Sequence, residues 1–288
     1  MTLTLPAPAK LNLFLHVTGR RPDGYHTLET LFQLLDFGDE LEFSWQPGTG
    51  FHLHCEEPQL QGENNLIARA AALLAPLRRR ELRVEVKLNK RLPLGGGVGG
   101  GSSDAATALL ALNRLWDCGL SIAELAQLGL KLGADVPVFV HGNSAWATGV
   151  GEDLEPTDLP EQWYVVLTPD CHADTGAIFR HPELTRDSAP LKIRGFPFSG
   201  SRNDCQAIAT RLYPAIAEAL TWLDRHAPAR MTGTGASVFA AFASEREALA
   251  VHAAIEAPWR GFVARGVNRS PVHVQLEALV PAQLEHGT

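Results

Sequence analysis

A run of glycines at residues 95–101 constrains the fold of this chain more than any other feature, because it holds six glycines in seven positions. It follows the alternating segment 82–88 and leads directly into Ser102, Ser103 and an alanine-rich stretch with a helical pattern. Glycine allows positive φ and close approach of backbone N–H groups to a ligand, and the free N–H groups of a helix start favour an anion. The sequence therefore predicts a strand, a phosphate-binding loop and a helix in that order, with a flexible surface linker as the alternative.

Several common phosphate-binding sequences do not fit this glycine tract. A Walker A loop needs a lysine directly before its terminal Ser or Thr, and Gly101 occupies that position. Gly95, Gly97 and Gly100 match the dinucleotide-binding pattern formally. The region that follows them is helical in pattern through Trp116, so it lacks the strand and acidic residue of a Rossmann unit. The H-R-D sequence of protein kinases does not occur in the chain.

Periodicity predicts the other elements. Residues 10–17 alternate as a half-buried strand does, which places Lys10 and Asn12 together on its polar face. Asn65 precedes a helical pattern over residues 66–80, and Ser121 with Glu124 forms a capping box before a helix over 122–132. The remaining predictions are a loop at 19–26, strands at 28–37, after Trp163 and at 261–267, helices at 176–180 and 244–255, a linker at 181–200, a helical region at 203–225 broken or kinked at Pro214, and a strand-turn-strand at 231–242.

Mixed strands and helices without strict βαβ alternation favour an α+β fold. The change in composition over residues 150–162 is the best candidate for a domain boundary. We therefore expect an N-terminal domain at 1–155 and a C-terminal domain at 156–288. With 288 residues, of which 45% are hydrophobic, the chain can bury a core of this size without disulfides.

Composition argues against several classes of protein. No apolar run approaches the roughly 18 residues of a membrane span, and the first residues lack the pattern of a signal peptide, so we expect a cytoplasmic protein without a membrane partner. A net charge of -7 argues against binding nucleic acid. Scattered cysteines indicate neither a disulfide framework nor a zinc site, and these are Cys55, Cys118, Cys171 and Cys205.

Three segments resemble the motifs of the GHMP kinases, a superfamily that includes galactokinase, homoserine kinase and mevalonate kinase. They are PAKLNLFLHVTGRRPDGYHTLETLF, PLGGGVGGGSSDAAT and MTGTGASVF, in the order of that superfamily from Pro8 to Phe239. The resemblance implies a two-domain α+β GHMP kinase fold, with the active site in the cleft between an N-terminal nucleotide-binding domain and a C-terminal α+β domain. It also implies ATP-dependent phosphorylation of a hydroxyl group.

Within the superfamily, RPDGYH, LGADVPVF and the glycine tract resemble one branch in particular. That branch phosphorylates a cytidine diphosphate-linked polyol in non-mevalonate isoprenoid synthesis. Another alcohol substrate, such as homoserine or mevalonate, is one alternative, and a nucleotide-binding relative without catalysis is another. We expect a monomer or a homodimer.

Phosphoryl transfer to an alcohol needs a carboxylate that accepts the hydroxyl proton and a positive charge near the migrating group. Asp135 lies among small and apolar residues, so it either caps a helix or has a cationic partner in a cleft. The sequence alone does not decide between these alternatives. The resemblance implies that Asp135 is the catalytic base and that Lys10 is its partner.

The resemblance also assigns binding roles. Tyr25 and His26 would recognise cytosine by stacking and hydrogen bonding, although loop packing is their plainer interpretation. Asn12 would bind the hydroxylated end of the polyol. Further substrate contacts are implied for Thr175, Phe179 and Gly235. The residues implied at ATP are Pro93, Leu94, Gly95, Gly96, Gly97, Val98, Gly99, Gly100, Gly101, Ser102, Ser103, Asn65, Leu66 and Lys90.

We expect Mg²⁺ to arrive with ATP, because no acidic cluster in the sequence indicates a dedicated metal site. Ser102 or Ser103 would supply an oxygen near the ion. Asp104 follows the two serines. A negative charge there suits an early helix position but would repel phosphate if it faced the glycine tract.

Overall fold

The computed structural model describes residues 1–191 and 201–279 of the chain. In this part of the chain strands and helices mix without strict alternation, and the predicted α+β class is confirmed. The elements are β1 (Thr2–Arg20), β2 (His26–Pro47), β3 (Phe51–Cys55), α1 (Leu66–Leu74), β4 (Leu82–Asn89), α2 (Gly100–Leu115), α3 (Ile122–Leu130), α4 (Val136–His141), β5 (Ala145–Thr148), β6 (Asp153–Pro156), β7 (Trp163–Thr168), α5 (Thr175–Arg180), α6 (Gln206–Leu212), α7 (Pro214–Asp224), β8 (Ala229–Met231), β9 (Val238–Phe242), α8 (Glu245–His252), β10 (Arg260–Val267) and α9 (Pro271–Ala278), with 3-10 turns at Pro58–Leu60 and Ala75–Leu77.

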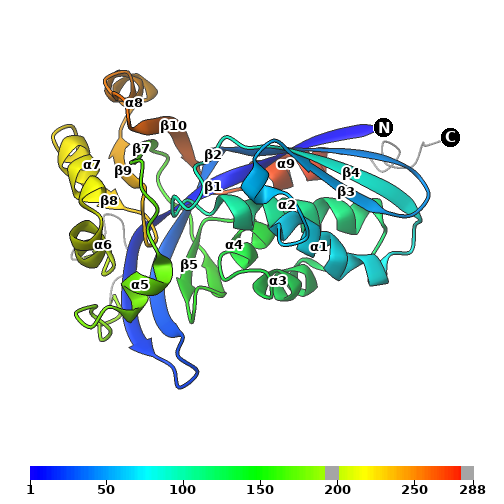
Figure 1. Cartoon of the computed structure of the whole chain (residues 1–288), viewed down its shortest axis with the longest axis horizontal. Coiled ribbons are helices and arrows are strands. Elements are labelled where there is room, and N and C mark those ends of the chain that lie inside the picture. Colours follow the sequence, from blue (N-terminus) through cyan, green and yellow to red (C-terminus); the bar gives the residue numbers. More distant parts are fainter. Residues whose placement is uncertain (192–200, 280–288) are drawn as a thin grey trace.

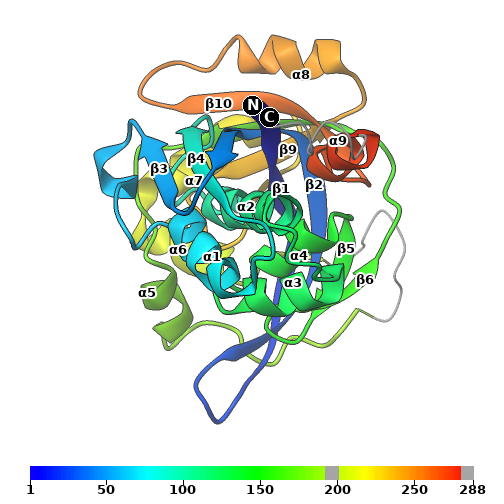
Figure 2. The same cartoon turned by 90° about the vertical axis from the view of Figure 1, so that its right-hand side faces the viewer.

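Ten strands of the described residues join into one sheet. β2 pairs antiparallel with β1, β4, β5 and β10, and the sheet continues through β7, β9 and β8 on one side and through β3 on the other. β1 and β2 run through the whole molecule, with α1–α4 gathered at one end and α5–α8 at the other (Figure 1). Figure 2 shows the turn between β1 and β2 projecting from the molecule. The same two strands therefore serve both ends.

Three groups of buried apolar side chains fill the interior. The first lies against α1–α4 and α9, the second against α5–α8, and the third joins them along β1, β2, β7, β9 and β10. Leu15 and Val17 of β1 pack in the second group, and Val272 of α9 packs in the first. The division into residues 1–155 and 156–288 stays a prediction, and these side chains cross it.

Local sequence signals mark the helix ends as predicted. Asn65 caps α1 by accepting a hydrogen bond from a backbone N–H two residues on, and Ser121 with Glu124 forms the capping box of α3. The break at Pro214 is confirmed, because α6 ends before it and α7 begins with it. Ser244 caps α8 with a second capping box, which the pattern analysis did not identify. Such caps satisfy backbone N–H groups that have no partner within the helix.

Some predictions about extent were wrong. The strand predicted at residues 28–37 is β2, which continues to Pro47. The helix after Asn65 ends at Leu74 instead of near residue 80, and Pro76 lies in the short 3-10 turn that follows, because proline cannot donate the next helical hydrogen bond. β1 is longer than residues 10–17, and it is buried on both faces from residue 7 to residue 17. Its polar face is covered by the glycine tract and by the turn between β8 and β9, as the contacts of Lys10 and Asn12 below show.

The pattern analysis did not identify β3, β5, β6 or α4, which are all six residues or shorter, nor the eight-residue helix α9. Residues 192–200 of the predicted linker 181–200 lie outside the described residues. Among the helices that the structure describes, none combines the length and apolar character that crossing a membrane requires.

Candidate active site

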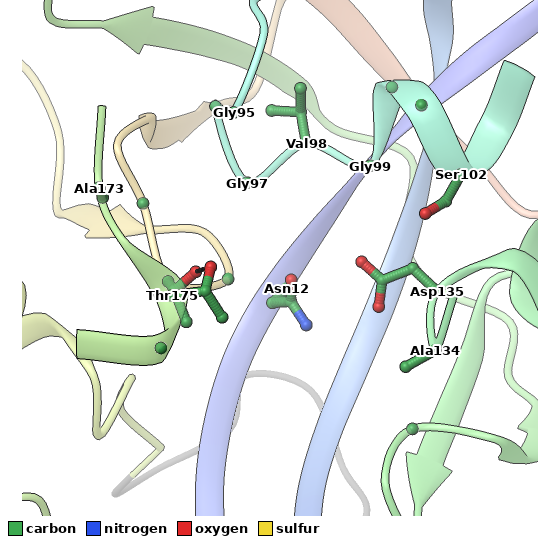
Figure 3. A pocket seen from close by; sticks show the side chains of 18 of the residues that line it. Asn12, Gly95, Gly97, Val98, Gly99, Ser102, Ala134, Asp135, Ala173 and Thr175 are labelled. Carbon is green, nitrogen blue, oxygen red and sulfur yellow. Dashed lines mark hydrogen bonds between the residues drawn. The ribbon is translucent and has the colours of Figure 1, made fainter. Parts of the chain in front are cut away.

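A cleft of about 1300 Å³ opens where the two ends of the molecule meet. In Figure 3 the glycine tract crosses one side of it, Ser102 and Asp135 lie near one another, Thr175 lies opposite them, and Asn12 lies between. Its volume exceeds the 300–1,000 Å³ that is typical of a site for one small molecule. The cleft can therefore hold two ligands. The predicted residues that line it are Lys10, Asn12, Tyr25, His26, Asn65, Leu66, Lys90, Pro93, Leu94, Gly95, Gly96, Gly97, Val98, Gly99, Gly100, Gly101, Ser102, Asp135, Thr175, Phe179 and Gly235.

The glycine tract forms a cradle from its backbone. Gly95, Gly97 and Gly99 have φ of 66°, 74° and 78°, and the residues between them do not have positive φ. Backbone N–H groups in such alternating conformations form concave sites for anions. Gly100 does not have positive φ, because it is already the first residue of α2.

Contacts with distant segments hold the tract in place. A Cβ at Gly97 would lie 2.5 Å from the carbonyl oxygen of Thr232, so only glycine fits there. The carbonyl of Gly96 accepts a hydrogen bond from the backbone N–H of Ser237 at 3.1 Å. Val98 is buried in the third apolar group, and its carbonyl accepts a hydrogen bond from the backbone of Lys10 at 2.9 Å. The tract is therefore fixed against β1 and the turn before β9.

The start of α2 lies directly beside this cradle. Gly99 is its N-cap and has no side chain, and the first backbone bond of the helix runs from Ser103 N to Gly99 O at 2.9 Å. The preceding N–H groups have no helical acceptor, as at any helix start, and such groups favour phosphate. Ser102 lines the cleft. Ser103 does not, because its side chain is fully buried.

Lys10 and Asp135 form an ion pair in the cleft, with Lys10 Nζ 3.1 Å from Asp135 Oδ2. The Lys10 side chain is 3% exposed and that of Asp135 is 35% exposed, so the carboxylate is the partner open to a ligand. Lys10 Nζ also donates to Asn12 Oδ1 at 2.6 Å and to the carbonyl of Gly97 at 3.1 Å. These acceptors compensate the burial of the ammonium group.

The two alternatives for Asp135 can now be compared. Asp135 occupies the N-cap position of α4, but its side chain makes no capping hydrogen bond. The carboxylate instead pairs with Lys10. In the structure, Asp135 therefore has a cationic partner in a cleft and does not cap the helix with its side chain.

Asn12 is held by contacts from two other segments. Its Nδ2 donates to Thr30 Oγ1 at 2.9 Å, and its backbone N–H donates to Thr232 Oγ1 at 2.9 Å. The pairing of β1 with β2 shifts register directly after Asn12, as at a β-bulge. Bulges re-aim side chains near functional sites. Sequence reasoning identified Asn12 but neither threonine.

At the far end of the cleft, Tyr25 and His26 lie at the turn between β1 and β2. Tyr25 is 66% exposed. The ring of His26 stacks on Phe179, with centroids 5.0 Å apart and an interplanar angle of 24°. Thr175 Oγ1 lies 2.8 Å from Thr234 Oγ1, which ties α5 to the turn that contains Gly235. Side chains from the turn between β1 and β2, from α5 and from the turn before β9 therefore meet here.

Arg186 determines which ring nitrogen of neutral His26 carries the hydrogen. Sequence reasoning did not identify Arg186. Arg186 Nε donates to His26 Nε2 at 3.1 Å. Because Nε2 is an acceptor, the neutral ring carries its hydrogen on Nδ1. Burial, together with the positive charges of Arg186 and Arg20, lowers the pKa of His26 from its ordinary value. No sequence signal marked Arg186, which lies in the predicted linker.

At the end of the cleft beside the glycine tract, Lys90 pairs with Asp39 and with Asp104, whose Oδ2 lies 3.0 Å from Lys90 Nζ. Burial alone would lower the pKa of Lys90, but the two carboxylates outweigh it and raise that pKa. Burial raises the pKa of Asp104 to about 8, with Lys90 opposing the rise and Asp39 adding to it. Asp104 therefore has a lysine partner beside the tract.

The described residues contain no group of three or more His, Cys, Asp or Glu side chains placed to hold a metal ion. The four cysteines are free thiols. Ser102 and Asp135 are oxygen-bearing side chains that line the cleft on the side of the cradle.

The fold and the cleft define the class of the protein. The family model described as GHMP kinases N terminal domain matches residues 65–143, and GHMP kinases C terminal matches residues 197–261. These two matches include the glycine tract, α2 and Asp135 in the first, and the turn before β9 in the second. The architecture is that of the GHMP kinases.

Sequence relatives narrow this class to one family. A protein of Pseudomonas entomophila (strain L48) is 54% identical over 278 residues, covering 96% of this chain and 97% of its own length. One of Nitrosococcus oceani is 52% identical over 268 residues, covering 93% of this chain and 96% of its own length. A crystal structure of 4-(cytidine 5'-diphospho)-2C-methyl-D-erythritol kinase has a TM-score of 0.81 at 34% identity, covering 92% of this chain and 100% of that one. Both sequence relatives are named 4-diphosphocytidyl-2-C-methyl-D-erythritol kinase, and the chain belongs to that family.

Proposed function

We propose that this protein transfers the γ-phosphoryl group of ATP to a hydroxyl of 4-diphosphocytidyl-2-C-methyl-D-erythritol. The product is the 2-phosphate, an intermediate of non-mevalonate isoprenoid precursor synthesis. The observation that carries the proposal is the ion pair of Lys10 with Asp135, at 3.1 Å, between a backbone phosphate cradle and an aromatic site. Relatives at 52–54% identity carry the name of this kinase, which favours this substrate over homoserine or mevalonate.

ATP is proposed to occupy the end of the cleft at the glycine tract. The cradle supplies backbone N–H groups for the phosphates, and the start of α2 adds its N–H groups and dipole. Gly97 leaves no room for a side chain, as expected where backbone must approach phosphate closely. Asn65, Leu66 and Leu94 line the same end and would contact the adenosine.

Asp135 is the proposed catalytic base. Its partly exposed carboxylate would take the proton of the attacking hydroxyl, whose oxygen bonds to the γ-phosphorus while the bond from that phosphorus to the β–γ bridging oxygen breaks. Lys10 would hold the Asp135 carboxylate in place through their ion pair and stabilise negative charge on the migrating group. Asn12, fixed by Thr30, would hydrogen-bond the polyol and orient the hydroxyl.

The cytosine is proposed to bind between Tyr25 and the Phe179 ring. Base–aromatic stacking is worth roughly 1–3 kcal/mol per base, and it needs an exposed ring such as that of Tyr25. His26 would donate from Nδ1 to an acceptor on the edge of the base, because Arg186 already donates to Nε2. Thr175 and Gly235 would contact the diphosphate side of the substrate.

Mg²⁺ is proposed to arrive with ATP and to neutralise phosphate charge in the cleft. The Ser102 hydroxyl and the Asp135 carboxylate are the residues that would meet it. The cytoplasmic location, the absence of nucleic-acid and membrane partners, and a monomeric or homodimeric state remain expectations from composition and resemblance.

The test offers purified protein ATP with each of three alcohols: the diphosphocytidyl substrate, mevalonate and homoserine. ADP release gives the rate, and ³¹P NMR of the product identifies the phosphorylated hydroxyl. We expect turnover of the diphosphocytidyl substrate alone, and its loss in Asp135→Asn. Efficient turnover of mevalonate or homoserine instead would indicate a different GHMP kinase. ATP binding without turnover of any alcohol would indicate a relative without catalysis.

A further inference from the structure

One buried ion cluster contacts both ends of the glycine tract. Lys90 follows β4 just before the tract, Asp104 belongs to α2 just after it, and Asp39 reaches both from β2. Lys90 Nζ pairs with Asp39 Oδ2 and lies 3.0 Å from Asp104 Oδ2. The lysine therefore links the two flanks of the tract to the sheet.

Asp39 also binds the backbone that leads into the tract. Its Oδ1 accepts hydrogen bonds from the backbone N–H groups of Arg91 and Leu92, at 2.6 and 2.7 Å. Both oxygens of Asp39 are thus acceptors, one for Lys90 and one for the backbone. Asp104 differs, because its Oδ1 is buried without a hydrogen-bond partner among the described residues.

The cluster lies against the phosphate cradle itself. A Cβ at Gly100 would lie 3.3 Å from Lys90 Nζ and 3.4 Å from Asp39 Oδ2. Gly100 is the first residue of α2, where N–H groups have no helical acceptor. If Lys90 were displaced, Gly100 at the start of α2 would therefore lose a packing contact.

Because the cluster is buried, stabilisation of the fold alone does not explain it. The side chains of Lys90, Asp39 and Asp104 are 7%, 0% and 5% exposed. Replacement of a buried ion cluster by apolar residues of similar volume is often neutral or stabilising. Burial and Asp39 both raise the pKa of Asp104, which reflects the cost of two carboxylates around one lysine. A role at the adjacent tract accounts for the presence of the cluster.

We propose that Asp39 and Asp104 are positioning residues that, through Lys90, hold the glycine tract in its phosphate-binding conformation before nucleotide binds. Glycine loses more conformational freedom on ordering than any other residue. A tract that became ordered only on binding would therefore bind nucleotide with lower affinity. That the nucleotide is ATP rests on the proposed function. That the glycine tract is ordered before any ligand binds does not depend on the proposed function.

The different use of their oxygens by Asp39 and Asp104 supplies a matched pair of variants. Asp39→Asn places an NH₂ group against either Lys90 or the backbone N–H groups, so one donor must lose its acceptor. Asp104→Asn can keep its oxygen on Lys90 and turn its NH₂ toward the position of the unpaired Oδ1. The same chemical change should therefore damage the cluster at residue 39 and preserve it at residue 104.

The experiment measures hydrogen exchange of residues 91–101 in ligand-free protein, together with KM for ATP, KM for the alcohol and kcat. For Asp39→Asn we expect faster exchange and about a tenfold higher KM for ATP, the scale of one lost hydrogen bond to a charged group, with kcat and the KM for the alcohol within a few-fold. Asp104→Asn should resemble the wild type. The exposed Glu277→Gln on α9 controls for loss of a carboxylate far from the cleft.

Asp104→Leu decides the case if Asp39→Asn does not fold, because it removes an acceptor of Lys90 and leaves the backbone bonds of Asp39 intact. It should also raise exchange and the KM for ATP. Folded Asp39→Asn or Asp104→Leu with unchanged exchange and unchanged KM for ATP would overturn the proposal. Hydrogen exchange reports on the tract even if the diphosphocytidyl compound proves not to be the substrate, so the two proposals fail separately.

Discussion

The two ends of the cleft are built in different ways. The proposed nucleotide end is made by the backbone of one continuous segment, the glycine tract and the first turn of α2. The proposed cytidine end is made by side chains from distant segments, such as His26 with Arg186, which are 160 residues apart. A backbone site tolerates no added side chain, whereas a side-chain site depends on each group that forms it. Substitutions at the two ends should therefore affect different substrates.

The largest effect is expected between the two ends, at Asp135. Asp135→Asn keeps the shape of the side chain but removes proton acceptance and the charge paired with Lys10. We expect kcat to fall about 10²-fold or more, the usual scale for a general base, with ATP affinity nearly unchanged. Steady-state kinetics and calorimetric ATP titration measure the two quantities. Turnover close to that of the wild type would show that Asp135 is not the base.

At the nucleotide end, Gly97→Val should weaken ATP binding by about tenfold or more, because valine resists positive φ and its Cβ would lie 2.5 Å from Thr232 O. The KM for the alcohol should change less. Circular dichroism checks that the variant is folded. Unchanged ATP affinity in folded Gly97→Val would indicate that the tract is a surface linker and does not bind phosphate.

At the cytidine end, Tyr25→Ala and Phe179→Ala should raise the KM for the diphosphocytidyl substrate by about tenfold, since each removes a ring proposed to stack on the base. The KM for ATP should stay within a few-fold of the wild type. Initial rates with one substrate varied at a time separate the two constants. An equal rise in both would mean that the ends of the cleft are not independent.

A smaller, pH-dependent effect is expected from Arg186. The pKa of His26 is lowered from its ordinary value of 6.5. The neutral ring and its hydrogen bond from Arg186 are therefore present at pH 6.5 and above, and they are lost as the pH falls through the lowered pKa. The KM for the alcohol should therefore rise on the acid side. Arg186→Met removes one cause of the lowering and should move that rise to higher pH. An identical pH profile in the variant would exclude His26 as the titrating group.

The same contrast explains what the sequence could predict. The glycine tract, the capping box of α3 and the break at Pro214 depend on residues within one turn of each other, so pattern reveals them. The acceptor of Arg186 and the partners of Lys90 lie in segments that only the folded sheet brings together. Similarly, the burial of both faces of β1 follows from what packs on it and not from its own alternation.

Neighbouring positions on one helix show the same limit. The resemblance implied both Ser102 and Ser103 at ATP, yet Ser102 lines the cleft and Ser103 is buried. Successive residues of an α-helix point about 100° apart, so two adjacent side chains rarely share a ligand. Which serine faces the cleft depends on the rotation of α2 about its axis. That rotation is set by packing against α1, α3 and α4, which the motif does not encode.

Inhibition by CMP tests the division of the cleft most directly. CMP carries the cytosine but not the reacting hydroxyl, so it should bind at Tyr25, His26 and Phe179. We expect CMP to compete with the diphosphocytidyl substrate and not with ATP, and to lose that ability in Tyr25→Ala. Competition with ATP, or no inhibition of an enzyme that turns over its alcohol efficiently, would contradict a cleft with a backbone nucleotide end and a side-chain cytidine end.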